Sequence, residues 1–126
     1  MASGAWHHST LQGRDDYIVE DEALVAMLLD DLLQVFGCQV VEIASRVETA
    51  LKSITERIFA VAVLSVNLKG ETSYPVANVL ELRRMPFLFA TGYGIQVIPE
   101  KYRQRAVVQK PFRKQDLEEA IPRAQK

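Results

Sequence analysis

The sequence predicts an α/β fold built around one parallel sheet of five strands. Short apolar runs of strand length alternate with segments that have helical spacing, and the run at 59–66 is almost entirely apolar. A continuous apolar run is typical of a strand buried on both faces, and strands separated by helices form βαβ units with right-handed crossovers. The 126 residues, of which 48% are hydrophobic, suffice for one core and are too few for two ordinary domains.

Five segments have the composition of strands, and polar residues follow most of them. The first runs into the acids Glu20 and Asp21, and the third ends at Ser65, before a polar loop that contains a glycine. The fourth ends at Thr91, and Lys110 follows the fifth. The predicted strands are DYIVEDE (16–22), CQVVEIA (38–44), FAVAVLSV (59–66), PFLFAT (86–91) and AVVQ (106–109).

Four segments have apolar residues at helical spacing together with signals for their ends. Gly37 follows the first where a C-terminal cap belongs, and Ser45 and Glu48 have capping-box spacing at the start of the second. We expect Ser73 to cap the third helix and Pro122 to end the fourth. The predicted helices span 22–36, 45–56, 72–85 and 113–121, whereas 92–103, with two glycines and Pro99, is a poor helix.

Composition excludes several classes of protein. The formal net charge is -1, and no run of Lys or Arg is long enough for a nucleic-acid or membrane patch. No apolar stretch reaches the roughly 18 residues of a membrane span and no signal-peptide pattern precedes the first strand, which favours a cytoplasmic protein. The single cysteine, Cys38, excludes an intrachain disulfide and is interpreted as a buried thiol.

The first 14 residues have no sustained periodicity. We interpret them as a disordered leader or the remnant of a tag, so that the folded domain spans 15–126. His7 and His8 lack further clustered ligands and receive no metal-binding role.

Five strands joined by helices are expected to form a small doubly wound, flavodoxin-like sheet of order 2-1-3-4-5. Such sheets bind ligands beyond the carboxyl ends of the strands, at the point where the strand order reverses, here between the first and third strands. The polar residues at these strand ends are therefore expected to share one crevice. They are the acids Glu20 and Asp21, the hydroxyls of Ser65 and Thr91, the amine of Lys110 and the loop residue Asn67.

Three of these residues also have a simpler structural explanation. Asp21 can be the N-cap of a helix, Thr91 a hydroxyl at a strand end and Lys110 a surface charge. Their convergence favours chemistry, because paired acids suit a hard cation such as Mg²⁺, whose ligand shell the backbone carbonyl of Asn67 can complete. A hydroxyl and a lysine suit the oxygens of a phosphoryl group.

Four motifs, in this order, resemble the receiver domains of bacterial two-component response regulators, which have a CheY-like fold of this kind. VEDE at 19–22 matches the acidic pocket, LSVNLKGE at 64–71 the loop after the third strand, FATG at 89–92 the switch threonine and QKPF at 109–112 the lysine with its proline. PFLFATGYG at 86–94 further resembles the PFxFATG-type single-domain regulators of the alphaproteobacterial general stress response. The resemblance covers 16–124.

The resemblance implies that Ser65 occupies the position of an aspartate that takes a phosphoryl group from a histidine kinase. In the family, that aspartate holds Mg²⁺ together with the acid that matches Asp21 and the carbonyl that matches Asn67. Serine lacks the carboxylate that forms an acyl phosphate and has no obvious general base nearby, so we expect a silent pocket with weak or absent Mg²⁺ binding. Lys110 loses its usual partner and is expected to turn to Glu20 or Asp21. A naturally degenerate receiver and a deliberate Asp-to-Ser substitution both fit this sequence.

The switch elements of the family are only partly matched. Val107 occupies the position where many receivers have an aromatic residue that rotates inward on activation, and valine cannot make that movement. Tyr93, between Gly92 and Gly94, is the available aromatic residue, and covering the sheet edge is its simpler role. The resemblance also implies a cis peptide bond before Pro111.

We expect no output domain after the last predicted helix and therefore expect the chain to act by contact, as a monomer and not as an enzyme. The expected partners are histidine kinases or histidine phosphotransfer proteins. With an aspartate at position 65, the chain is expected to act as a phosphoryl shuttle, sink or competitor for these partners. With Ser65, it is expected to bind them in its inactive state. The alternative is a flavodoxin-like ligand-binding module or enzyme unrelated to phosphorelay, although the chain lacks a Ser- or Thr-rich phosphate loop and a GxGxxG turn.

Overall fold

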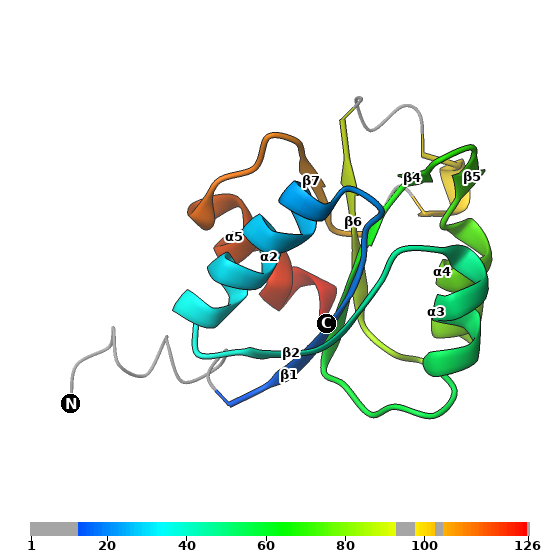
Figure 1. The fold of residues 1–126 in the computed structure, drawn as a ribbon, viewed down its shortest axis with the longest axis horizontal. Helices are drawn as coiled ribbons and strands as arrows, with labels where there is room; N and C mark the ends of the chain where they lie inside the picture. The colour runs from blue at the N-terminus through cyan, green and yellow to red at the C-terminus, as the bar shows by residue number, and fades with distance from the viewer. Residues whose placement is uncertain (1–12, 93–97, 103–104, 126) are drawn as a thin grey trace.

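The computed structural model describes residues 13–92, 98–102 and 105–125. Its main sheet contains β1 (Asp15–Val19), β2 (Gln39–Ala44), β3 (Val61–Ser65), β6 (Phe87–Thr91) and β7 (Val107–Gln109). These strands are all parallel and have the order β2-β1-β3-β6-β7 (Figure 1). Because β6 and β7 are the fourth and fifth strands of this sheet, the predicted order 2-1-3-4-5 is confirmed.

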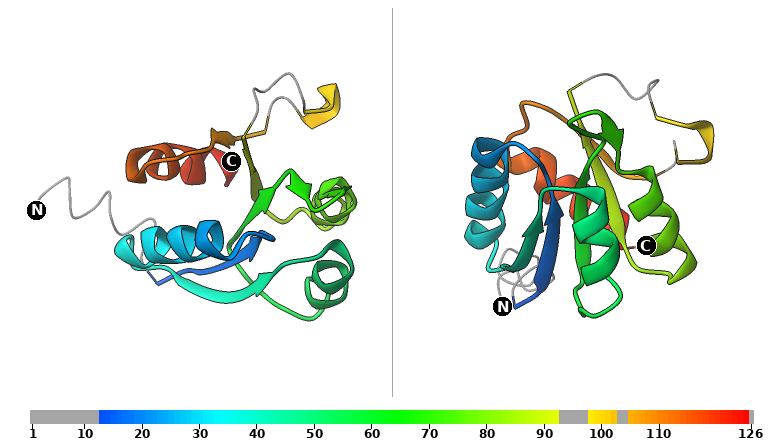
Figure 2. Two further views of the ribbon diagram at one scale, coloured as in Figure 1. Left: turned by 45° about the horizontal axis from the view of Figure 1, so that its top comes forward. Right: turned by 45° about the vertical axis from the view of Figure 1, so that its right-hand side comes forward.

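Helices cover both faces of the sheet (Figure 2). One face packs against α2 (Ala23–Val35) and α5 (Lys114–Ala124), and the other against α3 (Val47–Ser53) and α4 (Tyr74–Leu82). Every residue of β3 and β6 is buried, as predicted for central strands covered on both sides. The two cores include Ile18, Leu29, Leu33, Leu88 and Leu117 on the first face, and Val19, Leu64, Leu80, Phe87 and Phe89 on the second.

The first helix follows the predicted pattern. Ala26, Leu29 and Leu33 of α2 are buried at helical spacing, so one stripe of the helix faces the sheet. Gly37 has a φ of 84°, which a residue with a side chain adopts at a cost, and its N–H donates to the carbonyl of Gln34 at 2.9 Å. The predicted C-terminal cap is confirmed.

Two predicted caps differ from the structure. The capping box of Ser45 and Glu48 is wrong, because the N-cap of α3 is Arg46 and no side chain caps it. Strand β2 continues to Ala44, so Ser45 lies in the connection between this strand and α3, one residue before the N-cap. Ser73 does hold the N-cap position of α4, but its buried hydroxyl makes no cap hydrogen bond.

The last helix does not end at Pro122, which corrects a second expectation. Helix α5 continues to Ala124, and both Ile121 and Ala124 are buried in the core. Pro122 lies so near the end of the helix that its missing N–H removes one hydrogen bond, and the burial of its neighbours holds the final turn in place.

Between Gly92 and Ala106 the described residues contain one short element, the 3-10 helix Glu100–Tyr102, in keeping with the poor helical pattern there. Tyr102 is 1% exposed, and its ring packs against Phe87 and Phe89 of β6. Its hydroxyl donates to Asn78 of α4. A buried aromatic side chain thus attaches this connection to the sheet.

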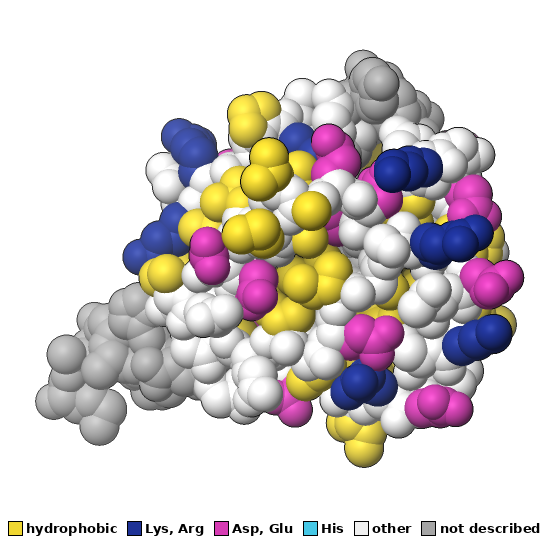
Figure 3. Space-filling model, in the orientation of Figure 1, with side chains coloured by type: hydrophobic (Ala, Val, Ile, Leu, Met, Phe, Trp, Pro, Cys, Tyr) yellow, Lys and Arg dark blue, Asp and Glu magenta, His cyan; other side chains and the backbone are white. Residues whose placement is uncertain are grey.

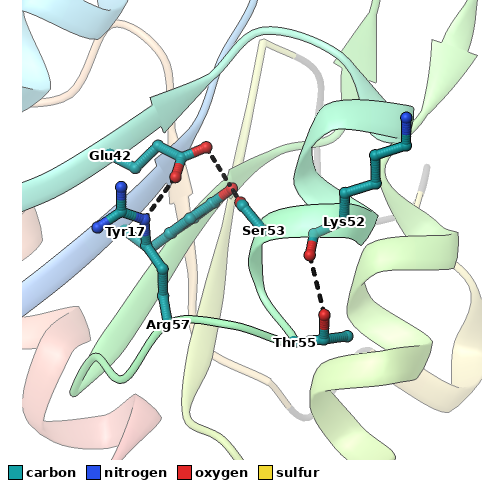
Figure 4. A network of polar contacts seen from close by, with 6 residues as sticks. All are labelled: Tyr17, Glu42, Lys52, Ser53, Thr55 and Arg57. Atoms are coloured by element: carbon teal, nitrogen blue, oxygen red, sulfur yellow. Dashed lines mark hydrogen bonds and ion pairs between the residues drawn. The ribbon is translucent and has the colours of Figure 1, made fainter.

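A polar network joins β1, β2 and the end of α3 (Figure 4). The hydroxyl of Tyr17 contacts the hydroxyl of Ser53 and donates to Glu42 at 3.3 Å, and Arg57 pairs with Glu42 at 2.6 Å. Burial raises the pKa of Tyr17 to about 12, so it remains a neutral donor. The network fixes the loop after α3 against the edge of the sheet.

A small hairpin follows β3. Strand β4 (Asn67–Leu68) pairs antiparallel with β5 (Glu71–Thr72), and the turn residues Lys69 and Gly70 have φ values of 39° and 86°. Two positive φ values are typical of a type I′ turn. The hairpin places Asn67 at the carboxyl edge of the sheet.

Candidate functional site

The carboxyl edge of the sheet gathers the residues that were expected to meet there. Glu20 directly follows β1, Ser65 and Thr91 are the last residues of β3 and β6, and Lys110 follows β7. Ser65 is completely buried, and Glu20 and Thr91 are each 2% exposed. Parallel strands with a common register bring these four side chains to one edge.

Glu20 is the centre of the contacts at this edge. Oε1 of Glu20 accepts a hydrogen bond from the hydroxyl of Ser65 and pairs with Nζ of Lys110 at 2.9 Å. The other carboxylate oxygen accepts the backbone N–H of Glu22 at 3.0 Å. The prediction that Lys110 turns to Glu20 or Asp21 is therefore confirmed, with Glu20 as the partner.

The electrostatic setting keeps Glu20 ionised. Burial by itself would raise the pKa of Glu20, but the hydrogen bonds from Ser65, Glu22 and Lys110 and the charge of Lys110 together lower it below its usual value. A carboxylate with a lowered pKa is a weak proton acceptor. Glu20 is thus close enough to Ser65 to be its base but is poorly suited to that role.

The strand ends around Ser65 are fixed by backbone hydrogen bonds. The N–H of Val66 donates to the carbonyl of Ala90 at 3.0 Å, and the N–H of Lys110 donates to the carbonyl of Thr91 at 2.7 Å. The Lys110–Pro111 peptide bond is cis, as the resemblance implied. Thr91 and Lys110 are thereby held on adjacent strands.

Two separate hollows lie along this edge. Thr91, Gly92 and Lys110 line one of them, together with Asn67, Ala90 and Glu22. Asp21 lines the other, beside Arg46, Lys69 and Glu71. Asp21 thus lines a different hollow from Thr91 and Lys110, although all were expected in one crevice.

The expected Mg²⁺ ligands do not fit the ion as they are arranged. The carboxylate of Glu20 is occupied by Ser65, Lys110 and an N–H group, while Asp21 and Asn67 line different hollows. Within the described residues, no group of three acidic, histidine or cysteine side chains could hold a metal. Mg²⁺ prefers near-octahedral oxygen ligands, and Ser65 offers a neutral hydroxyl where an aspartate would supply a carboxylate oxygen.

Sequence reasoning missed Glu22 as a member of the site. It is the N-cap residue of α2, its N–H binds Glu20, and it lines the hollow with Thr91 and Lys110. Its place in the motif VEDE, two residues after Glu20, was the available signal.

The expected switch residues are only partly described. Tyr93 and Gly94 lie outside the described residues. Gly92 lines the hollow next to Thr91, and Val107 is partly buried on β7 against the core. A Cβ atom at Gly92 would meet no non-neighbouring atom within 4 Å among the described residues, so their packing does not require glycine there.

The chain is similar to solved structures over most of its length. SdrG from Sphingomonas melonis Fr1, in solution, is 39% identical with a TM-score of 0.80, and the match covers 87% of this chain and 94% of SdrG. The chain belongs to the response regulator receiver domains. The REC domain of the PhyR response regulator from Erythrobacter litoralis is 22% identical, with a TM-score of 0.79 and coverage of 91% and 92%. No family model and no curated protein matches the chain.

A second structure of SdrG represents its BeF3-activated conformation. The present chain is 38% identical to SdrG in that structure, with a TM-score of 0.78 and coverage of 89% of this chain and 96% of SdrG.

Among the described helices, none combines the length and the apolar character needed to cross a membrane. The alternative of a module unrelated to phosphorelay is not favoured by these similarities.

Proposed function

We propose that this chain is a stand-alone receiver of the alphaproteobacterial general stress response that acts through protein contacts and does not accept a phosphoryl group. The observation that supports this proposal most directly is Ser65, a buried hydroxyl at the end of β3 that is hydrogen-bonded to Glu20. The similarity to SdrG supports signalling by phosphorelay. We propose that the protein is cytoplasmic and monomeric.

The chemistry of Ser65 supports a silent pocket. An acyl phosphate forms on a carboxylate, and a serine hydroxyl attacks phosphorus only when a base removes its proton. Glu20 is the base within reach, but its lowered pKa and its ion pair with Lys110 make it a poor one.

Most other parts of a phosphoryl site remain beside the serine. Thr91 and Lys110 share one hollow, where a hydroxyl and an ammonium group suit phosphoryl oxygens. We propose that these two residues would bind such oxygens if residue 65 were an aspartate, with Asp21 and the Asn67 carbonyl contributing to Mg²⁺ binding. Tyr93 would then respond to the movement of Thr91. Both a natural and an introduced origin of Ser65 remain compatible with this arrangement.

Contact with a partner is supported by the outer face of α2. Leu24, Met27, Leu28 and Val35 follow one stripe of the helix, and they are 81%, 59%, 43% and 63% exposed. Figure 3 shows hydrophobic side chains gathered over α2. The helix has no basic residue and contains two aspartates. We propose that this face, which begins next to Glu22, binds an apolar and basic helix of a histidine kinase or histidine phosphotransfer protein.

The test is phosphotransfer from candidate histidine kinases, and from a small acyl-phosphate donor, to three versions of the chain. The unchanged chain and Ser65→Asn, which matches aspartate in size without its charge, are expected to remain unlabelled by mass spectrometry. Ser65→Asp is expected to be labelled. Equal labelling of the unchanged chain, or no labelling of Ser65→Asp by any donor, contradicts the proposal.

Partner binding has its own control. Leu24→Glu is expected to weaken binding of the unchanged chain to a kinase that phosphorylates Ser65→Asp. Ile58→Glu changes a side chain that is 90% exposed in the loop after α3, away from α2, and is expected to leave binding unchanged. Equal effects of the two substitutions would remove α2 from the proposed interface.

A further inference from the structure

A second buried carboxylate lies at the opposite end of the sheet from Glu20. Asp16 is the second residue of β1, is 0% exposed, and lies between Val40 of β2 and Val61 of β3. It projects to the same side of the sheet as Ile18, toward the core under α2 and α5. Neither of its carboxylate oxygens has a hydrogen-bond partner of ordinary geometry among the described residues. An acid in this setting is costly to bury in its ionised form.

The groups that face Asp16 come from three strands or their approaches. Burial raises the pKa of Asp16 to about 6, although the Cys38 thiol, the Arg14 charge and the Val61 N–H each favour the ionised form and Asp15 opposes it. Burial also raises the pKa of Cys38 to about 12, so the thiol stays protonated where Asp16 titrates. Asp16 is therefore the group of this cluster that changes charge near neutral pH.

Arg14 connects this acid to the end of α5. Its guanidinium donates from Nη1 to Oε1 of Gln125 at 2.8 Å, and Gln125 is the C-cap residue of α5. The pairing of β1 with β2 is also irregular at this point, with a register shift between Asp16 and Tyr17. A new charge on Asp16 would thus arise where the pairing of β1 with β2 is irregular and next to the cation that binds the C-cap residue of α5.

We propose that Asp16, Arg14 and Gln125 form a proton-dependent joint that controls how firmly the C-terminal turn of α5 docks on the sheet. With Asp16 protonated, Arg14 binds Gln125 and the turn is held. With Asp16 ionised, the carboxylate attracts Arg14 away from Gln125 and requires solvent, so the turn is released more often. This device lies away from the pocket of Ser65 and does not depend on the proposed function.

The direction of the pH effect follows from linkage. A carboxyl group whose pKa is higher in the folded state than in the unfolded state stabilises the fold at low pH, and this contribution is lost as the pH rises through the folded-state value, here about 6. Between about pH 5 and pH 8 this one group is expected to raise the unfolding equilibrium constant about tenfold. Substitution of Asp16 by a residue that does not titrate is expected to abolish this rise of the unfolding equilibrium constant with pH, which is called the tenfold increment below.

The experiment compares urea unfolding of the unchanged chain, Asp16→Asn and Glu48→Gln from mildly acidic to mildly basic pH. Glu48 is an exposed acid of α3, on the other face of the sheet, and provides the control. We expect the unchanged chain and Glu48→Gln to show the tenfold increment and Asp16→Asn to lack it. Hydrogen exchange is expected to show faster opening of 123–125 at high pH in the unchanged chain, relative to Asp16→Asn, with no such difference in α4.

The proposal is overturned if Asp16→Asn has the same pH dependence as the unchanged chain, or if the extra opening does not occur at the end of α5. Should Asp16→Asn fail to fold, the carboxyl carbon of Asp16 can be titrated by NMR in the unchanged chain. A midpoint near neutral pH, with a parallel shift in the Gln125 side-chain amide, supports the joint. A midpoint at the value of an ordinary aspartate, or an unmoved Gln125 amide, overturns it.

Discussion

Lys110 and Glu20 form an ion pair of 2.9 Å at the carboxyl edge of the sheet, and Ser65 donates to the same oxygen that Lys110 contacts. The carboxylate of Glu20 is fully buried, whereas the side chain of Lys110 is 21% exposed. Glu20 therefore supplies the negative charge that Lys110 needs in the absence of a carboxylate at position 65. The charges of Glu20 and Lys110 therefore balance each other within the pocket.

Replacement of Lys110 is expected to destabilise the fold, because the buried charge of Glu20 loses its cation. Lys110→Met should lower the free energy of unfolding by about 2 kcal/mol at neutral pH, because it leaves a buried carboxylate with fewer partners. The pKa of Glu20 is lowered in the folded state, so the contribution of the pair is present above the pKa of an unfolded glutamate and is lost as the pH falls through the folded-state value. Chemical denaturation at neutral and acidic pH measures this difference, which should shrink in acid.

The matched control for this prediction is Lys114→Met, at the exposed start of α5. It should change stability by less than about 0.5 kcal/mol. Equal losses in the two variants would show that the pair with Glu20 contributes nothing specific.

Ser65→Asp is expected to create Mg²⁺ binding. The new carboxylate offers Lys110 a second partner, which frees Glu20, and adds a carboxylate oxygen at the end of β3 as a ligand. Without metal, the variant should melt at a lower temperature than the unchanged chain because a further acid is buried beside Glu20. Millimolar Mg²⁺ should restore its melting temperature and leave that of the unchanged chain and of Ser65→Asn unaltered. A similar response of all three to Mg²⁺ would contradict the prediction.

Gly92→Ala is expected to leave the fold intact. A Cβ atom there meets nothing within 4 Å in the described part of the chain, so the free energy of unfolding should change by less than about 0.5 kcal/mol. Gly37→Ala is the comparison, since its φ of 84° should cost about 1 kcal/mol with a side chain present. Any effect of Gly92→Ala on the activation of a Ser65→Asp chain, with stability unchanged, would then report on backbone movement beside Thr91. A large loss of stability would instead show that residue 92 packs closely.

Deletion of residues 1–12 is expected to leave thermal stability nearly unchanged. The predicted boundary lies after residue 14, but the N–H of Gly13 donates to the carbonyl of Gly37 at 2.9 Å, and Arg14 binds Gln125. The deletion should therefore stop before Gly13. Thermal unfolding of the shortened chain measures the outcome, and a loss above about 1 kcal/mol would show that these residues contact the domain. A deletion to residue 14 should cost more, because it removes both contacts.

Local patterns predicted the elements of this fold well and their ends less well. The sheet order, the buried central strands and the cap at Gly37 all follow from apolar periodicity and glycine placement. The predicted cap at Ser45 was wrong because β2 extends to Ala44. The predicted end of α5 at Pro122 was wrong because the burial of Ala124 outweighs the local preference of proline. The ends of helices depend on tertiary packing that a short motif does not contain.

The sequence by itself was enough to identify a receiver domain and to predict that Ser65 occupies the phosphoacceptor position, because the motifs at the four strand ends are local and occur in the order of the family. Only the tertiary structure decided which acid pairs with Lys110, that Asp21 and Thr91 line different hollows, and that Asp16 is buried next to Arg14. These outcomes depend on distances between atoms far apart in the chain and on the solvent excluded between them, and both arise only when the strands and helices pack.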